Sequence, residues 1–138
     1  MIPTIFDASL EAYISSAMAI PVYASVLPQS FSNYPGCVYT LVYQTPKYTM
    51  GSAAYLVEAE YQFDIYGPDA LEVERMNELL RISLESYRGM MGSTYVSGSR
   101  IVDTHQLDEE SIDGSDSWLY RLSSEYTIIY QETVPIFS

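Results

Sequence analysis

The sequence is poor in the residues that build reactive or metal-binding sites. Its 138 residues include one cysteine, Cys37, and one histidine, His105. A single cysteine forms no disulfide within the chain, and this pair cannot supply a zinc ligand set. A Ser-His-Asp triad would depend on His105, and no G-x-S-x-G elbow precedes a predicted helix. We therefore expect a protein that is not an enzyme and needs no metal or cofactor, with His105 at a strand end near carboxylates.

Basic residues are also scarce. Six Lys and Arg stand against 18 Asp and Glu, which gives a formal net charge of −12. The basic residues are scattered along the chain: Lys47, Arg75, Arg81, Arg88, Arg100 and Arg121. Because nucleic-acid readers cluster Lys and Arg against phosphates, this pattern excludes adhesion to nucleic acid. An acidic protein can still lie beside DNA that passes without binding.

Long apolar runs are missing as well. No run reaches the roughly 18 residues that a membrane-spanning helix needs, so we expect no membrane segment. The N-terminal residues lack a basic stretch and include Asp7 and Glu11, which does not fit a secretory signal. These features indicate synthesis in a reducing cytoplasm. The length and a hydrophobic fraction of 48% predict one domain over residues 1–138.

Two segments have the spacing of helices. Apolar residues of Thr4–Ala19 recur on one face until Pro21 ends the segment. A longer helix is predicted over Asp69–Arg88, with Gly89 as its terminator. Its apolar stripe is expected to consist of Leu71, Met76, Leu79, Leu80, Ile82, Leu84 and Tyr87.

The remaining regular segments have the composition of strands. They are a short extended stretch at Val22–Leu27 and longer strands at Cys37–Thr45, Tyr55–Ile65, Tyr95–Thr104 and Trp118–Gln131. Tyr55–Ile65 alternates most regularly and is expected to pair with Cys37–Thr45 as a long antiparallel hairpin. The sequence therefore predicts an α+β fold: a twisted, mainly antiparallel sheet of about four to five strands with helices on one face.

Acidic side chains occupy one side of the strand Tyr55–Ile65. Glu58, Glu60 and Asp64 share that side, opposite the apolar residues. Such a row fits a solvated sheet face whose like charges oppose unwanted pairing. It also leaves open a small acidic hydrolase with a general acid and base among these carboxylates.

Two segments between strands are candidate contact sites for partners. We predict a loop at Pro46–Ala54, with Lys47, Tyr48 and Met50, and an acidic loop at Gln106–Ser117. The acidic loop contains Asp108, Glu109 and Glu110. Both segments are also explained as solvated connections. Residues 109–114 are similar to half of a calcium-binding EF-hand loop, but Tyr120 stands where the bidentate Glu is needed, so a solvated loop is the better interpretation.

Tyrosine is abundant, with 14 residues against 4 Phe and 1 Trp. A tyrosine buries its ring while its hydroxyl remains hydrated, which suits half-exposed strands and protein interfaces alike. The composition therefore predicts either a Tyr-rich sheet face or an interface.

The order of these elements resembles the tail terminator (tail completion, or tail-to-head joining) proteins of tailed bacteriophages. The similar stretches are Val22–Ser30, with its extended segment ending in Pro28, then Tyr34–Tyr39, Tyr61–Gly67 and Tyr120–Tyr130. The resemblance covers nearly the whole chain through short, degenerate motifs.

This resemblance implies a virion protein assembled in the host cytoplasm. It implies a homo-oligomeric ring, commonly a hexamer, on the head-proximal end of the tail tube. The ring would stop tube polymerisation and join a head-completion or neck protein, with DNA passing through its lumen. Glu58, Glu60 and Asp64 are then candidate luminal acids. Another ring component of the neck or tail, such as a head-closure or tail-tube subunit, remains an alternative.

Overall fold

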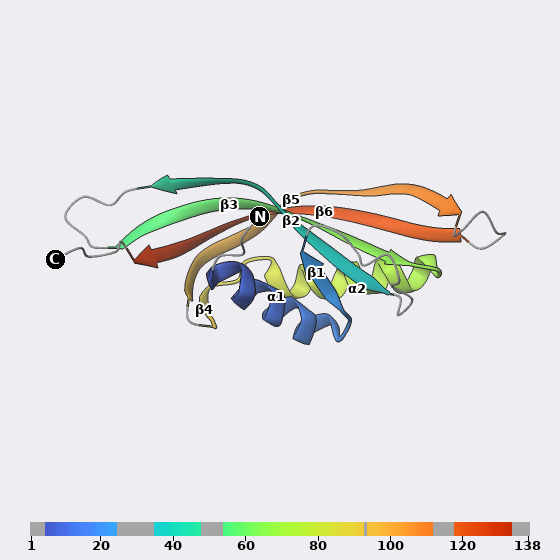
Figure 1. Ribbon diagram of the computed structural model, residues 1–138, viewed down its shortest axis with the longest axis horizontal. Coiled ribbons are helices and arrows are strands. Elements are labelled where there is room, and N and C mark those ends of the chain that lie inside the picture. The colour runs from blue at the N-terminus through green and yellow to red at the C-terminus, as the bar shows by residue number, and fades with distance from the viewer. Residues whose placement is uncertain (1–4, 25–34, 48–53, 93, 112–117, 134–138) are drawn as a thin grey trace.

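A computed structural model of the chain describes residues 5–24, 35–47, 54–92, 94–111 and 118–133 (Figure 1). Its elements are α1 (Ile5–Met18), β1 (Val22–Ala24), β2 (Gly36–Lys47), β3 (Ala54–Gly67), α2 (Ala70–Leu84), β4 (Gly89–Met91), β5 (Thr94–Ser111) and β6 (Trp118–Thr133). The strands form one sheet in the order β1-β2-β3-β6-β5-β4. All neighbours pair antiparallel except β1 and β2. The predicted α+β class is confirmed, with six described strands rather than four to five.

The two helices lie side by side beneath one face of the curved sheet (Figure 1). α1 contacts β1, β4 and β5, whereas α2 contacts β3, β5 and β6. The strands continue beyond the helices at both ends of the long axis (Figure 1). The helices therefore bury the middle of one sheet face, and the opposite face of β3 and β6 has no helix over it in Figure 1.

Capping and backbone turns set the ends of α2. Asp69 precedes the helix, and its side chain accepts a hydrogen bond from the backbone N–H of Leu71 at 3.1 Å. The helix ends at Leu84 rather than at the predicted Arg88, because Ser86 takes a left-handed conformation with φ 63°. The Ser86 N–H then donates to the Ser99 carbonyl at 2.7 Å, which ties the end of α2 to β5.

The predicted apolar stripe of α2 is wrong at two positions. Leu71 and Ile82 are 71% and 67% exposed. The buried residues of α2 are Val73, Asn77, Leu80 and Leu84. These positions recur at helical spacing on one side, so the buried face is narrower than the apolar composition implied. Asn77 is tolerated there because the Ser124 hydroxyl donates to its Oδ1 at 2.6 Å.

Strand pairing confirms the predicted hairpin and extends most strands. β2 pairs with β3 from Gly36–Tyr66 to Lys47–Leu56, so Pro46 and Lys47 continue a strand where a loop was expected. β5 continues to Ser111 instead of ending at Thr104, which makes residues 106–111 strand rather than acidic loop. Pairing with β6 supplies these hydrogen bonds, and local sequence carries little signal for such long-range pairing. The remaining predicted loop residues, 48–53 and 112–117, lie outside the described residues.

Aromatic rings join the sheet to α1. Phe6 of α1 stacks on Tyr130 with ring centroids 4.1 Å apart, and it meets Tyr61 at 6.0 Å. Phe63 contacts Tyr126 edge-on at 5.7 Å. The buried tyrosines of this core are Tyr39, Tyr61, Tyr126 and Tyr130. The sheet-face interpretation therefore holds for these tyrosines, whereas Tyr43 is 43% exposed.

Candidate functional site

The helix-free side of β3 and β6 is the most distinctive surface of the sheet. On β3, buried Val57, Ala59 and Tyr61 alternate with residues that point to this side. We call this surface the open face. Its paired residues on β3 and β6 are Glu58–Ile129, Glu60–Thr127, Gln62–Glu125, Asp64–Ser123 and Tyr66–Arg121.

Acids extend from the open face of β3 across the sheet. Glu58 and Glu60 are half-buried, and Asp64 is 7% exposed. The Gln62 side-chain amide donates to both Asp64 carboxylate oxygens at 3.1 and 3.2 Å. Asp64 is therefore a buried carboxylate that accepts hydrogen bonds, whereas Glu58 and Glu60 of the predicted row are half-buried.

Further acids continue this row on the neighbouring strands. Glu125 of β6 lies opposite Gln62, and Asp103 of β5 lies opposite Glu125. The positive side chains of the same surface are Arg100, opposite Thr127, and Arg121, which lies 5.8 Å from the centroid of the Tyr66 ring. Acids thus outnumber bases along this part of the sheet.

Two β-bulges flank the centre of the open face at the same level. β2 shifts register between Leu41 and Tyr43, and β5 shifts between Ile101 and Asp103. Leu41 and Ile101 lie opposite Tyr61 and Tyr126, which themselves pair across β3 and β6, so the bulges are level with each other.

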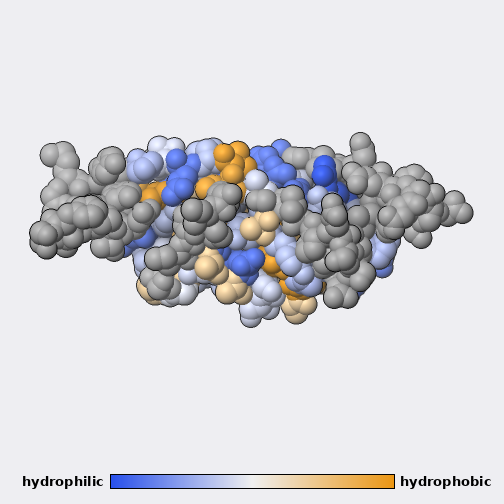
Figure 2. Space-filling view, viewed as in Figure 1, coloured by the Kyte–Doolittle hydropathy of each residue, from blue (hydrophilic) through white to orange (hydrophobic). Residues whose placement is uncertain are grey.

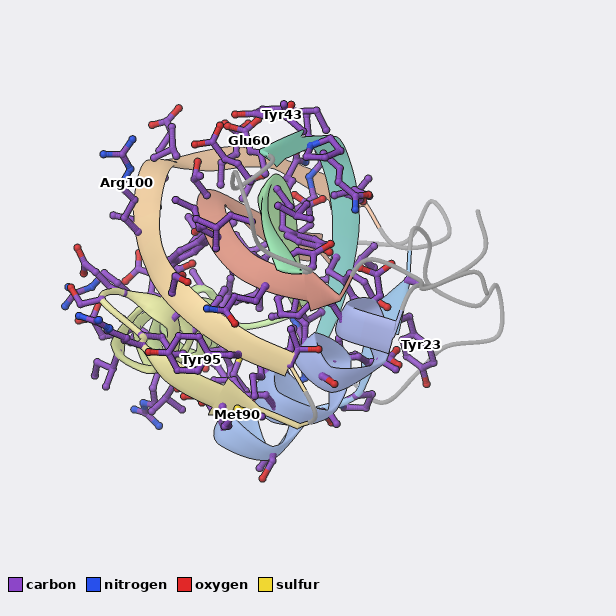
Figure 3. The ribbon with its side chains drawn as sticks, turned by 90° about the vertical axis from the view of Figure 1, so that its left-hand side faces the viewer. Tyr23, Tyr43, Glu60, Met90, Tyr95 and Arg100 are labelled. Atoms are coloured by element: carbon purple, nitrogen blue, oxygen red, sulfur yellow. The ribbon has the colours of Figure 1, made fainter. Side chains whose placement is uncertain are left out.

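A bulge adds one residue to its strand and re-aims side chains. The inserted Val42 and Val102 are 49% and 51% exposed. Figure 3 shows Tyr43 and Glu60 next to each other on the side away from the helices, with Arg100 pointing outward from β5. In Figure 2, a small hydrophobic group stands between hydrophilic residues along the upper margin.

A cavity of about 440 Å³ lies beside the start of β5. It is a pocket open to solvent, bordered by the turn after α2 and by the strands β3, β5 and β6. Its lining residues are Glu58, Ser86, Tyr87, Arg88, Ser97, Gly98, Ser99, Arg100, Thr127 and Ile129. Ser99 is 6% exposed, and its hydroxyl has no hydrogen-bond partner among the described residues. Sequence pattern alone does not predict this pocket, because its lining comes from four segments that meet only in the folded chain. The only local signal was the small-residue stretch before Arg100.

The predicted contact residues that the structure describes lie towards strand ends rather than in loops. Lys47 is the last residue of β2, while Tyr48 and Met50 lie outside the described residues. Asp108, Glu109 and Glu110 belong to β5, which shifts register between Leu107 and Glu110. The acidic segment therefore sits near the end of a paired strand.

Several buried polar groups are structural. Asp7 of α1 is fully buried and accepts a hydrogen bond from the Tyr61 hydroxyl. Burial, followed by that hydrogen bond to Asp7, raises the pKa of Tyr61. Cys37 is also fully buried, and burial raises the pKa of its thiol, so it is not an activated nucleophile.

The three predicted strand carboxylates do not converge on one site. The cavity is lined by Glu58, whereas Glu60 and Asp64 lie outside its lining. Glu58 and Asp64 are both in the extended strand β3, which places them roughly 20 Å apart, beyond the spacing of a glycosidase pair. Among the described residues, no group of His, Cys, Asp and Glu is placed to hold a metal ion, and no helix has the length and apolarity to cross a membrane.

Comparisons with known proteins identify the fold. No protein-family model matches the sequence, and a search of curated proteins finds no relative. A chain in the solved structure "Virion of native gene transfer agent (GTA) particle" matches with a TM-score of 0.53 and 8% identity, over 88% of this chain and 86% of that chain. A second solved structure covers 95% of this chain and 93% of its own at 12% identity, but its TM-score of 0.48 carries no argument. At 8% identity the first likeness shows a shared fold alone.

Proposed function

We propose that this chain is a non-enzymatic structural subunit of a phage-like virion. The observation that carries this proposal is the fold shared with a chain of the gene transfer agent virion over 88% of one chain and 86% of the other. Such coverage relates the whole architecture rather than one supersecondary motif. The acidic composition and the lack of converging strand carboxylates agree with a structural role.

Within that class, our more specific proposal is a tail terminator: a ring, hexameric by resemblance, on the head-proximal end of the tail tube. The sheet supports this proposal because its two outer edges differ in which part of the strand is left uncovered. β2 pairs with β1 only as far as Tyr39, and β5 pairs with β4 only between Thr94 and Val96. Among the described strands, the rest of β2 and of β5 each has one edge that no other strand covers.

Two different edges on opposite sides of one sheet suit a head-to-tail interface. When unlike surfaces of successive copies meet, the assembly closes into a ring if the rotation permits. Both edge strands carry a bulge, and β2 also contains Pro46, which cannot donate a backbone hydrogen bond. These features oppose nonspecific strand pairing at the edges, so side-chain contacts would determine which partner binds. The neighbouring tube and neck proteins would then meet the ends of the sheet, at Lys47, Tyr48 and Met50 and at Asp108, Glu109 and Glu110.

The open face is our candidate for the lumen. Glu58 and Glu60, together with the more deeply buried Asp64 farther along β3, would give the pore negative charge. Negative charge repels phosphates, so DNA would slide through the ring without adhering.

The test is the mass of the purified chain in solution, combined with its effect on tail tubes. We expect light scattering to give a closed oligomer at rising concentration, and negative-stain images to show rings that bind tube ends and stop their growth. Open-ended tubes made by the chain itself would favour the tail-tube alternative. A monomer at every concentration that leaves tube length unchanged would refute the terminator proposal.

A further inference from the structure

The pocket beside the start of β5 has open space at a position that lacks a side chain. Gly98 lines it, and no described atom beyond the adjoining residues lies within 4 Å of the place that a Cβ on Gly98 would take. Tyr87 and Ile129 add apolar surface to the same lining. An aromatic ring can shield a glycine in an edge strand. The pocket is therefore suited to receive a flat apolar side chain.

The two arginines of the pocket add an electrostatic preference. Arg88 and Arg100 are exposed and line the pocket together with one acid, Glu58. Arg88 donates a hydrogen bond to the Tyr95 hydroxyl at 3.4 Å. The side chain of Arg100 has no ion-pair or hydrogen-bond partner among the described residues. A guanidinium attracts the electron-rich face of an aromatic ring, so the pocket favours an aromatic occupant.

A tyrosine projects from the opposite edge of the sheet. Tyr43 of β2 is 43% exposed and follows Val42, the inserted residue of the β2 bulge, which is 49% exposed. Tyr43 lies next to Glu60 on the side away from the helices (Figure 3). Among the described strands, β1 covers β2 only as far as Tyr39, so Tyr43 lies on the uncovered part of this edge. Glu60 gives the surface beside Tyr43 a charge opposite to that of the two pocket arginines.

Tyr43 and the pocket lie at the same level of the sheet. One row of paired residues crosses four strands in the order Tyr43, Glu60, Thr127 and Arg100. Residues directly opposite each other in antiparallel strands lie on the same face, which places Tyr43 and Arg100 on the open face. β2 and β5 run in opposite directions, because three antiparallel pairings separate them.

A closed ring brings the two edges together at one height. Successive copies in such a ring are related by rotation, with no shift along the ring axis. When that axis runs along the strands, the Tyr43 edge of one copy meets the Arg100 edge of the next copy at the same level. The two edge strands then lie antiparallel, as β2, β3, β6 and β5 already do within one copy.

We propose that Tyr43 of one copy inserts into the pocket of a second copy, over Gly98 and against Arg88 and Arg100. The contact joins unlike surfaces, so each copy gives its Tyr43 to one neighbour and its pocket to the other. The inference rests on the proposed ring, and it names the side chain and the pocket that select the partner at the sheet edges.

Removing the tyrosine and filling the pocket test the contact from its two sides. Tyr43→Ala removes the ring, and Gly98→Leu occupies the pocket from a position where a Cβ has open space within its own copy. Each variant should weaken self-association about tenfold or more, as truncation of a central interface tyrosine does. Gly98→Ala fills less of the pocket and should have a smaller effect. Light scattering over a concentration series measures these shifts.

Mixing the two variants shows whether the two surfaces meet each other. The Tyr43→Ala copy keeps its pocket and the Gly98→Leu copy keeps its tyrosine, so one productive contact remains between them. The mixture should form a heterodimer at concentrations at which each variant alone is monomeric.

Photo-crosslinking locates the contact in a chain that keeps an aromatic ring at position 43. With p-benzoylphenylalanine in place of Tyr43, ultraviolet light should produce a band at twice the chain mass. Mass spectrometry should find the link in residues 86–88 or 97–100 of the second copy. This measurement does not depend on how the truncated variants fold.

A matched control separates this contact from a general loss of exposed apolar surface. Leu71→Ala truncates a side chain of α2 that is 71% exposed and lies outside the pocket, and it should assemble like the wild type. Circular dichroism should give unchanged spectra for all variants, which separates a lost contact from misfolding.

The outcomes distinguish this inference from the proposed function. If the wild type forms rings and Tyr43→Ala and Gly98→Leu form them equally well, the contact is refuted and the ring stands. Crosslinks from position 43 that reach only other parts of a neighbour refute the contact as well. Weakening by both variants, with recovery in their mixture, supports it. A wild type that remains monomeric at every concentration contradicts both the ring and the contact.

Discussion

The two faces of the paired strands β3 and β6 differ in almost every physical property although they share one backbone. Towards the helices, Tyr61, Phe63 and Tyr126 are buried and packed ring against ring. Towards the open face, Glu58 and Glu60 are half-buried and opposite Ile129 and Thr127. The buried aromatic packing is therefore concentrated on the face towards the helices, whereas the open face carries charged side chains.

The two faces also differ in how their buried polar side chains are hydrogen-bonded. On the helix side, Asp7 and Asn77 are buried and each accepts a hydrogen bond from the sheet, from Tyr61 and Ser124 respectively. On the open face, the buried Asp64 is held from its own strand by Gln62. The hydrogen bonds to Asp7 and Asn77 thus connect the helices to the sheet, whereas those to Asp64 stay within β3.

The largest expected difference comes from truncating one side chain on each face of β3. Phe63→Ala should lower the free energy of unfolding by about 3–5 kcal/mol, because it leaves a cavity among Tyr61 and Tyr126. Glu60→Ala should change it by no more than roughly 0.5 kcal/mol. Urea denaturation of both variants measures the contrast. Similar losses from the two substitutions would show that the open face also carries stability.

A smaller difference is expected between two tyrosines that pair across β3 and β6. Tyr61→Phe removes a hydroxyl that donates to buried Asp7 and should cost about 1–3 kcal/mol. The Tyr126 hydroxyl is buried with no hydrogen-bond partner among the described residues, so Tyr126→Phe should be neutral or slightly stabilising. Thermal unfolding of both variants tests this. Equal destabilisation would mean that the hydroxyl of Tyr126 has a partner in solution.

The smallest effect is a loss of stability at alkaline pH that originates in the helix-covered face. Burial raises the pKa of Tyr39 to about 12, with a further contribution from the negative charges of Glu11 and Asp7. In the unfolded chain this tyrosine ionises near the ordinary tyrosine pKa of 10.0, whereas in the folded chain it stays protonated at that pH. The folded state then binds more protons, so this contribution is complete below about pH 10 and decreases as the pH rises towards 12.

Tyr39→Phe removes that titration. The decline of unfolding free energy between about pH 10 and 12 should become shallower in this variant, measured by chemical denaturation at each pH. Part of the decline should remain, since burial also raises the pKa of Tyr61 and Tyr126. Identical pH profiles for the wild type and the variant would contradict the assignment to Tyr39.

Local pattern was sufficient for every described element except the short strand β4, but insufficient for the ends of several of them. The alternation in Tyr55–Ile65 identified both the strand and its buried side. The predicted helix start at Asp69 lies one residue before α2, where Asp69 is the N-cap. The end of α2 depended on the left-handed Ser86 and its hydrogen bond to Ser99, which no local propensity encodes. The last residues of β5 were assigned to a loop because acids disfavour strands locally, while pairing with β6 overrides that preference.

The candidate surfaces were predictable to different degrees. The acids of the open face followed from period-two alternation within one strand. The cavity brings Arg88 from the turn after α2 to Arg100 of β5, and a search for clustered cations along the sequence cannot find that proximity. The burial of Asp64 could not be predicted either, because alternation shows which face of the sheet a side chain lies on but not how exposed it is.

The sequence by itself determined the sign of the charge, the α+β class and the side of β3 that carries acids, since these depend on composition and on local periodicity. Only the tertiary structure decided which edges and pockets are left open at the surface. Strand order left edges of β2 and β5 uncovered among the described strands, and the turn after α2 placed Arg88 beside the same pocket as Arg100. Such features arise from contacts between residues far apart in the chain, whose geometry no local pattern contains.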